Sequence, residues 1–583
     1  MRCLSDMTRR KKKDEEEQQE DKDESYLFKN NANTTIEQEV QCLKKLLETK
    51  NEIILDKERY INQLVNENRR LQEHYELITN SIVDKETIIT SLGKINERVE
   101  KIEQSLNILK AVNRYKWGAD PKINILFYRC YTRSILDYGC FLYGSATKTR
   151  LAKLDRLQYK GLRLALGALK STPTATLLAE CQEPPLHLRR LFLAEKFIIK
   201  CSFNDQTALT RKVAQLTTLN LTLPWWQNKN SPTLAEAYPN ISLYNIEGDN
   251  IPFFKSQYNI SFSNLETYIT VAENPPIMKQ LLHDLLQKFV TPCRIYTDGS
   301  KSEQGVGCAV FIEDEKVSLK YKLDPICSIF TAELAAIDLA LEWVVCNRPS
   351  YQKFIIMSDS QSAIRALQNA PFHIYHNKTI VSILEKESQL RQLRKSVAFI
   401  WIKGHARIEG NEMADRLAKV AASSGEEKQY VTKTDIASSR KLNMKKSWQM
   451  EWTNFCTNNN NQYCKIYPNL PDSPIELRSH VNRRVHSMYF RCLVGHATVK
   501  AYLHRFGLEE SDTCSCDGNR DDINHWLFQC KFNSTASVYM MSELATLGVP
   551  FQVKPPFCIQ ALTIHQFEKL YGTSSREPDG KYN

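Results

Sequence analysis

The 583-residue sequence has no apolar run of the ~18 residues that a membrane span requires. It also has no secretory signal peptide at its start, so we expect its 17 cysteines to be reduced thiols. These absences argue against a membrane partner and against a disulfide-stabilised secreted domain. We therefore predict an intracellular protein of the nucleus or cytoplasm, and 42% hydrophobic content is ordinary for globular domains.

Proline is missing from residues 35–110, where apolar residues recur every seven positions. Such a pattern predicts a coiled coil, and Asn68 is the kind of polar core residue that fixes its register. Beyond Leu92 the phase slips by three residues, which would overwind the coil locally. We therefore predict a homo-oligomer, with a long helix packed on its own protein as the alternative. The seam positions are Leu47, Ile54, Ile61, Tyr75, Ile82 and Ile89, then Leu43, Leu64, Leu71, Ile78 and Leu92, then Ile95, Val99, Ile102, Leu106 and Leu109.

The clearest positive signal is a set of four acidic residues between positions 294 and 419, each in a distinctive setting. They are Asp298 in YTDGS, Glu333 in TAELAA, Asp359 in MSDSQ and Asp415 in NEMADR. Strand-like runs precede Asp298 and Asp359, whereas Glu333 and Asp415 lie on helical patterns. Carboxylates held together repel one another unless a cation neutralises them, and Mg²⁺ prefers such oxygen ligands. The sequence therefore predicts a divalent-metal site.

This segment resembles the type-1 ribonuclease H domain of non-LTR retrotransposon polyproteins. The matching pieces are TDGS, a hairpin at Gly305–Val310, TAELAAI, SDSQSAI, WIKGH and GNEMADRLAK. The resemblance implies an α/β domain at 291–424, with a mixed five-stranded sheet flanked by helices. Its strands would lie at 294–297, 306–312, 317–323, 354–357 and 397–402.

The resemblance also assigns chemistry to these residues. Asp298, Glu333, Asp359 and Asp415 would bind two Mg²⁺ ions, with Mn²⁺ as a substitute, and Asp298 would bridge them. One ion would activate water and the other would stabilise the leaving 3′ oxygen. His405, in WIKGHA, would assist proton movement or product release. The expected reaction is cleavage of the RNA strand of an RNA–DNA hybrid.

Basic residues are concentrated in 111–212, where 18 Lys and Arg face 7 Asp and Glu. On the helical pattern from Leu151 to Ala168, the residues Lys153, Arg156, Lys160 and Arg163 fall on one face. Leu154, Leu157, Leu162 and Leu166 form the apolar side. The basic face is either solvated surface or a contact for the phosphates of other nucleic acid.

The words RSILDYG and ECQEPPLHLRR in this region also resemble retrotransposon polyproteins. They are similar to the thumb-like connection between polymerase and ribonuclease H in jockey-like elements. The Tyr-x-Asp-Asp of a polymerase palm is missing, because the one Asp-Asp pair is Asp521–Asp522. We therefore expect no reverse transcriptase activity from this chain.

Near the C-terminus, Cys514, Cys516, His525 and Cys530 offer the soft ligands of a tetrahedral Zn²⁺ site. The gap between the first two cysteines is unusually short, so unrelated cysteines are the alternative. The tail resembles the zinc-knuckle-like module that follows ribonuclease H in the same elements, and this implies structural zinc.

The predicted organisation has eight segments, and two function classes fit it. One class is a metal-dependent endoribonuclease, and the other is an inert, self-associating nucleic-acid-binding remnant. The segments are a disordered charged tail (1–34), a coiled coil (35–110), a basic helical region (111–212), a linker with short elements (213–290), the ribonuclease H domain (291–424), a helical region (425–510), the Cys/His module (511–535) and a tail (536–583).

Overall fold

A computed structural model describes most of the chain after residue 84. The predicted tail at 1–34, nearly all of the predicted coiled coil before residue 85, and the end of the chain lie outside the described residues. No helix within the described part is long and apolar enough to cross a membrane. The described residues are 85–113, 118–202, 208–222, 230–244, 266–269, 275–347, 349–369, 377–459, 461–471 and 483–548, together with Asn66 and Gln566.

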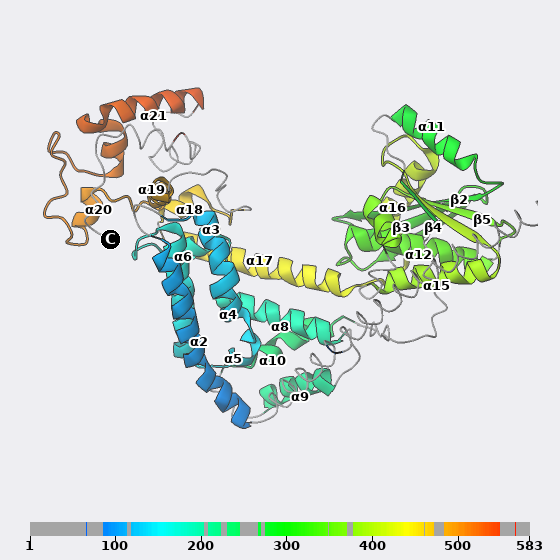
Figure 1. Ribbon diagram of the computed structural model, residues 1–583, viewed down its shortest axis with the longest axis horizontal. Coiled ribbons are helices and arrows are strands. Elements are labelled where there is room, and N and C mark those ends of the chain that lie inside the picture. Colours follow the sequence, from blue (N-terminus) through cyan, green and yellow to red (C-terminus); the bar gives the residue numbers. More distant parts are fainter. Residues whose placement is uncertain are drawn as a thin grey trace, which may run out of the picture. The chain divides into compact units, whose positions relative to one another are not determined.

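A mixed sheet of seven described strands forms the centre of the α/β domain (Figure 1). The strand order is β1-β6-β5-β2-β3-β4-β7. β2, β3 and β4 pair antiparallel, and every other pair is parallel. The domain elements are β1 (Glu266–Ile269), α11 (Pro275–Leu286), β2 (Cys293–Ser302), β3 (Gly305–Ile312), β4 (Val317–Leu323), α12 (Ile329–Asn347), β5 (Lys353–Ser358), α13 (Gln361–Gln368), α15 (Lys378–Gln392), β6 (Ser396–Trp401), α16 (Glu409–Ser424) and β7 (Glu426–Glu427).

The five predicted strands are confirmed as β2 to β6, and the sheet has two further strands, β1 and β7, from outside the predicted domain at 291–424. β1 comes from the segment predicted as a linker and pairs with β6. β7 has only two residues, which pair with β4. Both added strands lie at the edges of the sheet. Their pairing partners, rather than an apolar pattern of their own, determine that they are strands.

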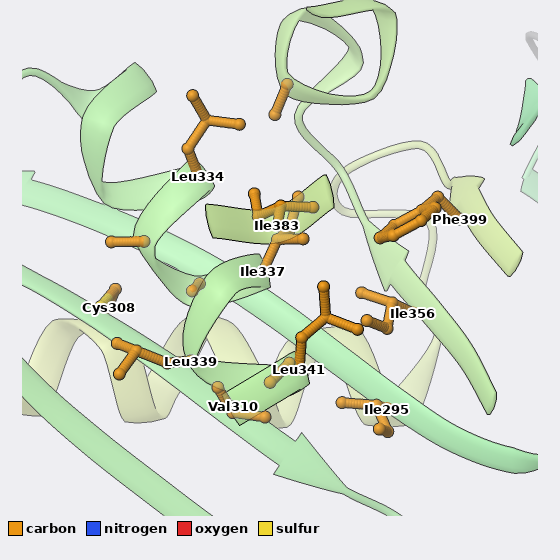
Figure 2. Packing of buried hydrophobic residues seen from close by; sticks show 14 of the residues in the cluster. Ile295, Cys308, Val310, Leu334, Ile337, Leu339, Leu341, Ile356, Ile383 and Phe399 are labelled. Atoms are coloured by element: carbon orange, nitrogen blue, oxygen red, sulfur yellow. The ribbon is translucent and has the colours of Figure 1, made fainter. Parts of the chain in front are cut away.

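The two faces of the sheet have separate apolar cores, because successive strand residues point to opposite sides. On one face, Ile295, Ile356 and Phe399 pack with α12 and α15 (Figure 2). On the other face, Tyr296, Ile355 and Ile400 pack with residues of α11 and α16. The α16 helix can approach the sheet closely because Gly307 has no side chain. A Cβ there would lie 2.4 Å from the backbone nitrogen of Ala422.

Before the sheet, the chain is helical. These elements are α2 (Lys85–Ala111), α3 (Pro121–Phe127), a π-helix (Tyr128–Arg133), α4 (Ser134–Asp137), α5 (Cys140–Tyr143), α6 (Lys148–Leu166), α7 (Thr174–Cys181), α8 (Leu186–Ser202), α9 (Ala208–Thr222) and α10 (Thr233–Ser242).

The α2 helix tests the last part of the predicted coiled coil. Its shifted seam is buried, with Ile95, Ile102, Leu106 and Leu109 almost inaccessible to solvent. These side chains pack in one cluster with residues of α4, α5 and α6 of the same chain. For this stretch, the helix packs on its own protein, which was the alternative interpretation.

After the sheet come α17 (Lys433–Asn458), α18 (Gln462–Ile466), α19 (Arg483–Leu493), α20 (Lys500–His504), a π-helix (His525–Gln529), a 3-10 turn (Lys531–Asn533) and α21 (Ser534–Thr546). These elements share a core with α6 and α7, which lie about 300 residues earlier. Arg483 donates to the carbonyls of Leu164 and Ala165 at the end of α6. Arg491 donates to Gly167 at the same helix end. The guanidinium groups thereby satisfy carbonyls that a helix leaves unpaired.

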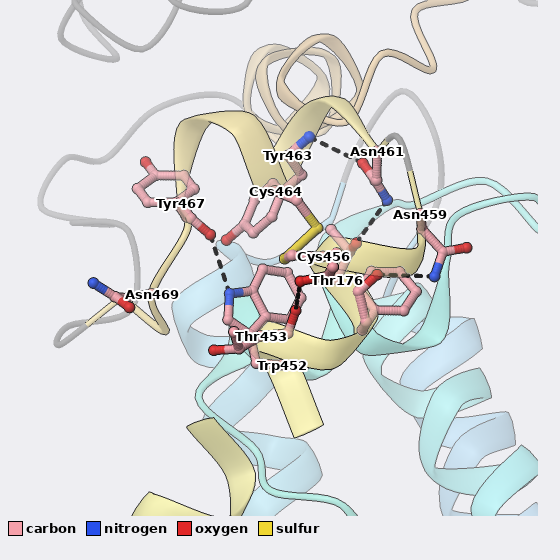
Figure 3. The surroundings of a disulfide bond; sticks show 12 residues. Thr176, Trp452, Thr453, Cys456, Asn459, Asn461, Tyr463, Cys464, Tyr467 and Asn469 are labelled. Atoms are coloured by element: carbon pink, nitrogen blue, oxygen red, sulfur yellow. Dashed lines mark hydrogen bonds between the residues drawn. A yellow bond between two sulfur atoms is a disulfide. The ribbon is translucent and has the colours of Figure 1, made fainter. Parts of the chain in front are cut away.

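The prediction that all cysteines are free was wrong for Cys456 and Cys464, which form a disulfide (Figure 3). It joins the end of α17 to α18, and the two Cα atoms are 5.3 Å apart, within the range that a disulfide bridges. Close by, Trp452 donates its indole N–H to the carbonyl of Tyr467 at 3.1 Å. A separation of eight residues in the sequence does not by itself indicate a disulfide. The turn between α17 and α18 brings the two thiols together.

Candidate active site and metal centre

Asp298 and Asp359 lie side by side because β2 and β5 are parallel neighbours. In this pair Thr297 is in register with Ser358, so the next residue on each strand is one of the two aspartates. Asp298 is only 5% exposed and Asp359 is half-buried. The two carboxylates thus lie side by side where β5 ends and β2 continues beyond it along β3.

Glu333 reaches the same place from the first turns of α12, where Leu334, Ile337 and Leu341 are buried in the core. The helix can approach β2 because Gly299 has no side chain. A Cβ on Gly299 would lie 2.7 Å from the backbone nitrogen of Glu333. Glu333 itself is 6% exposed.

One carboxylate oxygen from each of Asp298, Glu333 and Asp359 lies within 4.8 Å of the other two. Burial, and then the neighbouring carboxylates, raise the pKa of Asp298 to about 8. The same causes raise the pKa of Glu333, and burial raises the pKa of Asp359. The Oε2 atom of Glu333 is buried and has no hydrogen-bond partner among the described residues. A divalent cation fits this cluster, because it would neutralise the charge and give that oxygen a partner.

Asp415 lies at the edge of the cluster rather than within it. Its Oδ2 atom forms a 2.7 Å ion pair with Lys419, one turn further along α16. Its charge still contributes to raising the pKa of Asp298 and of Asp359. The structure therefore brings three of the four predicted ligands together, while the fourth, Asp415, is paired with Lys419.

His405 is exposed and lies in the loop between β6 and α16, where its φ of 56° is left-handed. The preceding Gly404 runs close to the cluster, since a Cβ there would lie 2.9 Å from Oδ2 of Asp359. The charge of His405 acts to lower the pKa of Asp359. The histidine is thus near the carboxylates on an accessible loop.

Two residues that support Asp359 were not found from the sequence. Trp401 donates its indole N–H to the backbone carbonyl of Asp359 at 2.9 Å. Asn411 is buried, and its amide lies 3.4 Å from Oδ2 of Asp359, where it lowers the pKa of that carboxyl. Both residues lie within the quoted words WIKGH and GNEMAD. Only the folded geometry shows that they converge on one aspartate.

The basic face predicted on α6 is only partly present. Lys153, Arg156 and Lys160 are exposed, and the leucines of the opposite side are buried. Arg163 is half-buried, and it donates to the carbonyl of Thr172 at 3.1 Å. The face therefore presents three cations to solvent, while the fourth stabilises a neighbouring turn.

The structure brings the four predicted zinc ligands together. A hairpin-like loop closed by the Thr513–Arg520 bridge carries Cys514 and Cys516. The second π-helix supplies His525, and Cys530 follows its end. One ligand atom from each lies within 4.8 Å of the others, and the Cys516 sulfur is 3.2 Å from Nε2 of His525. Three sulfurs and one imidazole, mostly buried, suit Zn²⁺.

Residues 291–423 match the family model described as RNase H, so this part of the chain is an RNase H domain. The chain is also similar to solved structures over 22% of its length. The N-terminal RNase H domain of a Mycobacterium tuberculosis protein, fused to maltose-binding protein, is 17% identical over 94% of that chain, with a TM-score of 0.18. RNase H1 of Halobacterium salinarum is 18% identical over 96% of that chain, with a TM-score of 0.16. A foamy viral protease-reverse transcriptase in complex with double-stranded DNA is 20% identical over 93% of that chain, with a TM-score of 0.18. No curated protein matches the chain.

Proposed function

We propose that this chain is a metal-dependent endoribonuclease that hydrolyses the RNA strand of RNA–DNA hybrids. The observation that supports this most is the cluster of Asp298, Glu333 and Asp359, within an RNase H domain. Two buried carboxylates and a half-buried one, held together, are unfavourable unless a cation is bound. Glu333 in particular keeps a buried oxygen that has no hydrogen-bond partner within the described part of the chain.

Asp298, Glu333 and Asp359 would hold Mg²⁺, with Asp415 as a further ligand. Bound Mg²⁺ would lower the pKa of a water and stabilise the charge that develops on the leaving 3′ oxygen, and a pair of ions would divide these roles. Trp401 and Asn411 hold Asp359 in position through their hydrogen bonds. His405, on its exposed loop, would take up or release the protons of the reaction.

The Asp298→Asn variant tests the site assignment. It removes a ligand charge without removing a contact to nucleic acid, so cleavage should fall below detection while hybrid binding stays within about twofold. The Glu303→Gln variant, which changes an exposed acid at the β2–β3 turn, is the matched control. Cleavage by Asp298→Asn at the parent rate would refute the assignment.

We also propose that Cys514, Cys516, His525 and Cys530 bind structural Zn²⁺, because protein atoms would fill all four positions. The metal would fix the π-helix that places Trp526 and Leu527 in the core shared with α6 and α7. Zinc analysis of the purified chain should find one equivalent, and a Cys514→Ser, Cys530→Ser variant should lose it. An unchanged zinc content in that variant would reject the site.

Derivation from a retrotransposon is a further part of this proposal. It rests on the sequence words that resemble the connection and tail of jockey-like elements. The proposal predicts no primer extension on an RNA template, and extension by the purified chain would contradict it.

A further inference from the structure

The α17 helix carries a charge pattern that the proposed function does not use. Between Asp435 and Glu451 it has no acidic residue, and it contains Arg440, Lys441, Lys445 and Lys446. Arg440 is paired with Glu195 of α8. Lys441, Lys445 and Lys446 are all exposed, and none of the three forms an ion pair with another described residue.

The exposed lysines gather on the side of α17 that does not pack on the protein. Lys441 and Lys445 are four residues apart, so their side chains are neighbours. Lys446 lies about 100° further round the helix and is also exposed. The buried positions of the helix are Ile436, Trp448 and Trp452, in addition to Asp435. This solvent-facing group of Lys441, Lys445 and Lys446, which we call the α17 lysine face, is therefore a concentrated and uncompensated positive charge.

The beginning of α17 is fixed to the active-site end of α12. Asp435 is only 1% exposed and accepts hydrogen bonds from the backbone nitrogen of Ser328 at 2.9 Å and the hydroxyl of Thr331 at 2.8 Å. Thr331 is two residues before Glu333, a member of the carboxylate cluster. Thr432 completes a capping box with Asp435. The position of α17 is therefore tied to the turn that carries Glu333.

The far end of α17 is also held, because Trp448 and Trp452 belong to the core shared with α6 and α7. A helix anchored at both ends presents its charges in a fixed arrangement. At about 1.5 Å per residue, the lysine face lies roughly 9–17 Å along the helix from Asp435. That distance corresponds to about three to five nucleotides of one strand at ~3.4 Å each.

We propose that the α17 lysine face binds the phosphate backbone of the hybrid where it extends beyond the base pairs held at the carboxylate site. This inference rests on the proposed function, since it names a second contact for the same substrate. The phosphate backbone carries regularly spaced negative charges, which would attract the three unpaired lysines on this rigid helix. The ammonium groups of lysine contact phosphate as point charges. The α17 lysine face increases the affinity for long hybrids and takes no part in the cleavage reaction.

The test compares two charge-reversal variants of the full chain. One replaces Lys441, Lys445 and Lys446 with Glu. The matched control replaces Lys110, Lys279 and Lys316, three exposed lysines on other elements, and therefore changes the net charge equally. Binding to hybrids of about 8 and about 24 base pairs is measured in chelator, over a range of salt concentrations. Circular dichroism melting checks that both variants are folded.

We expect the α17 variant to lose at least tenfold in affinity for the long hybrid, and less than threefold for the short one. The slope of log affinity against log salt for the long hybrid should become shallower by about 2 to 3, one unit for each lost phosphate contact. The control should change by less than threefold on both hybrids. Equal losses in the two variants, or equal losses on both lengths, would overturn the proposal.

Failure of the proposed function would be seen separately. Cleavage of both hybrids by the parent chain in Mg²⁺ is measured beside the binding curves. A parent chain that binds but does not cut would refute the nuclease assignment and leave the comparison of binding intact. A tenfold loss on anionic lipid vesicles with none on the long hybrid would assign the face to a membrane surface and overturn the inference.

Discussion

Gly299 sets how closely Glu333 can approach Asp298. A methyl group at this position would lie 2.7 Å from the backbone nitrogen of Glu333 and 2.9 Å from the carbonyl carbon of Ala332. Neither backbone atom belongs to a flexible side chain, so α12 would have to move away from β2. A cluster that binds a small cation tolerates little such movement.

We therefore predict that Gly299→Ala weakens Mg²⁺ binding and lowers the cleavage rate at least tenfold. Titration calorimetry without substrate measures the first effect, and hybrid cleavage measures the second. Ser302→Ala, at the exposed end of the same strand, is the control. Unchanged metal affinity in Gly299→Ala would show that the approach of α12 is not what forms the cluster.

Glu180 gives a second test at the residue scale, through pH. It is fully buried, accepts a 2.8 Å hydrogen bond from Tyr463, and burial raises its pKa to about 8. The folded chain therefore binds a proton here that the unfolded chain releases near its ordinary pKa. Stability from this group is complete below about pH 4.5 and is lost as the pH rises towards 8, at about 1.4 kcal/mol per pKa unit.

The Glu180→Gln variant should accordingly show a smaller fall in melting temperature between pH 5 and pH 8 than the parent. Both are measured in Mg²⁺, so that the carboxylate cluster contributes equally. Parallel pH profiles for the two proteins would contradict the assignment of the buried proton to Glu180.

At the scale of residues, a site residue could be predicted from the sequence when it lies in a recognisable short motif. Asp298, Glu333 and Asp359 each lie in such a motif, and they meet as expected. The supporting roles of Trp401 and Asn411 depend on how the end of β6 and the start of α16 lie beside Asp359, which spacing alone does not encode. Asp415 was predicted as a ligand from the same resemblance, but its contact with Lys419 follows from side-chain geometry on α16.

At the scale of elements, α17 begins with a buried cap that joins it to α12. Asp435→Ala would remove the capping box and leave the donors of Ser328 and Thr331 without their partner. We predict a loss of about 1–3 kcal/mol in stability, from the lost cap and the unpaired buried donors. Chemical denaturation measures it, with Thr434→Ala, one exposed position earlier, as the control. Equal stability in the two variants would refute the cap.

Strands with a clear apolar run were predictable, whereas edge strands were not. β2 to β6 combine buried residues with flanking turns, so the sequence locates them to within a few residues. β1 has only four residues, in a largely polar segment, and β7 consists of Glu426 and Glu427. These strands form because β6 and β4 offer unpaired backbone groups, which is a property of the folded sheet.

At the scale of the whole molecule, segments that seemed separate in sequence share one core. The basic helical region and the segments after the RNase H domain contribute to the same apolar cluster. The amphipathic pattern of α6 shows that it has a buried side but not what covers that side. Likewise, the heptad-like seam of α2 could not distinguish a partner chain from its own chain.

Because the seam of α2 is used within the chain, we expect any self-association to depend on the predicted heptads before residue 85. We predict that the full chain is an oligomer and that a variant lacking residues 1–84 is a monomer. Size-exclusion chromatography with light scattering measures both masses. An oligomeric truncated chain would place the contact elsewhere, and a monomeric full chain would refute the predicted coiled coil.

The most direct test of the central claim is cleavage of a strand-labelled RNA–DNA hybrid by the full chain. Double-stranded RNA and single-stranded RNA are tested beside it, in Mg²⁺ and in chelator. We predict cutting of the RNA strand in the hybrid alone, in Mg²⁺ alone, because the carboxylate cluster needs a cation to act. Folded protein that binds the hybrid in Mg²⁺ without cutting it would contradict the account and identify a nucleic-acid-binding remnant instead.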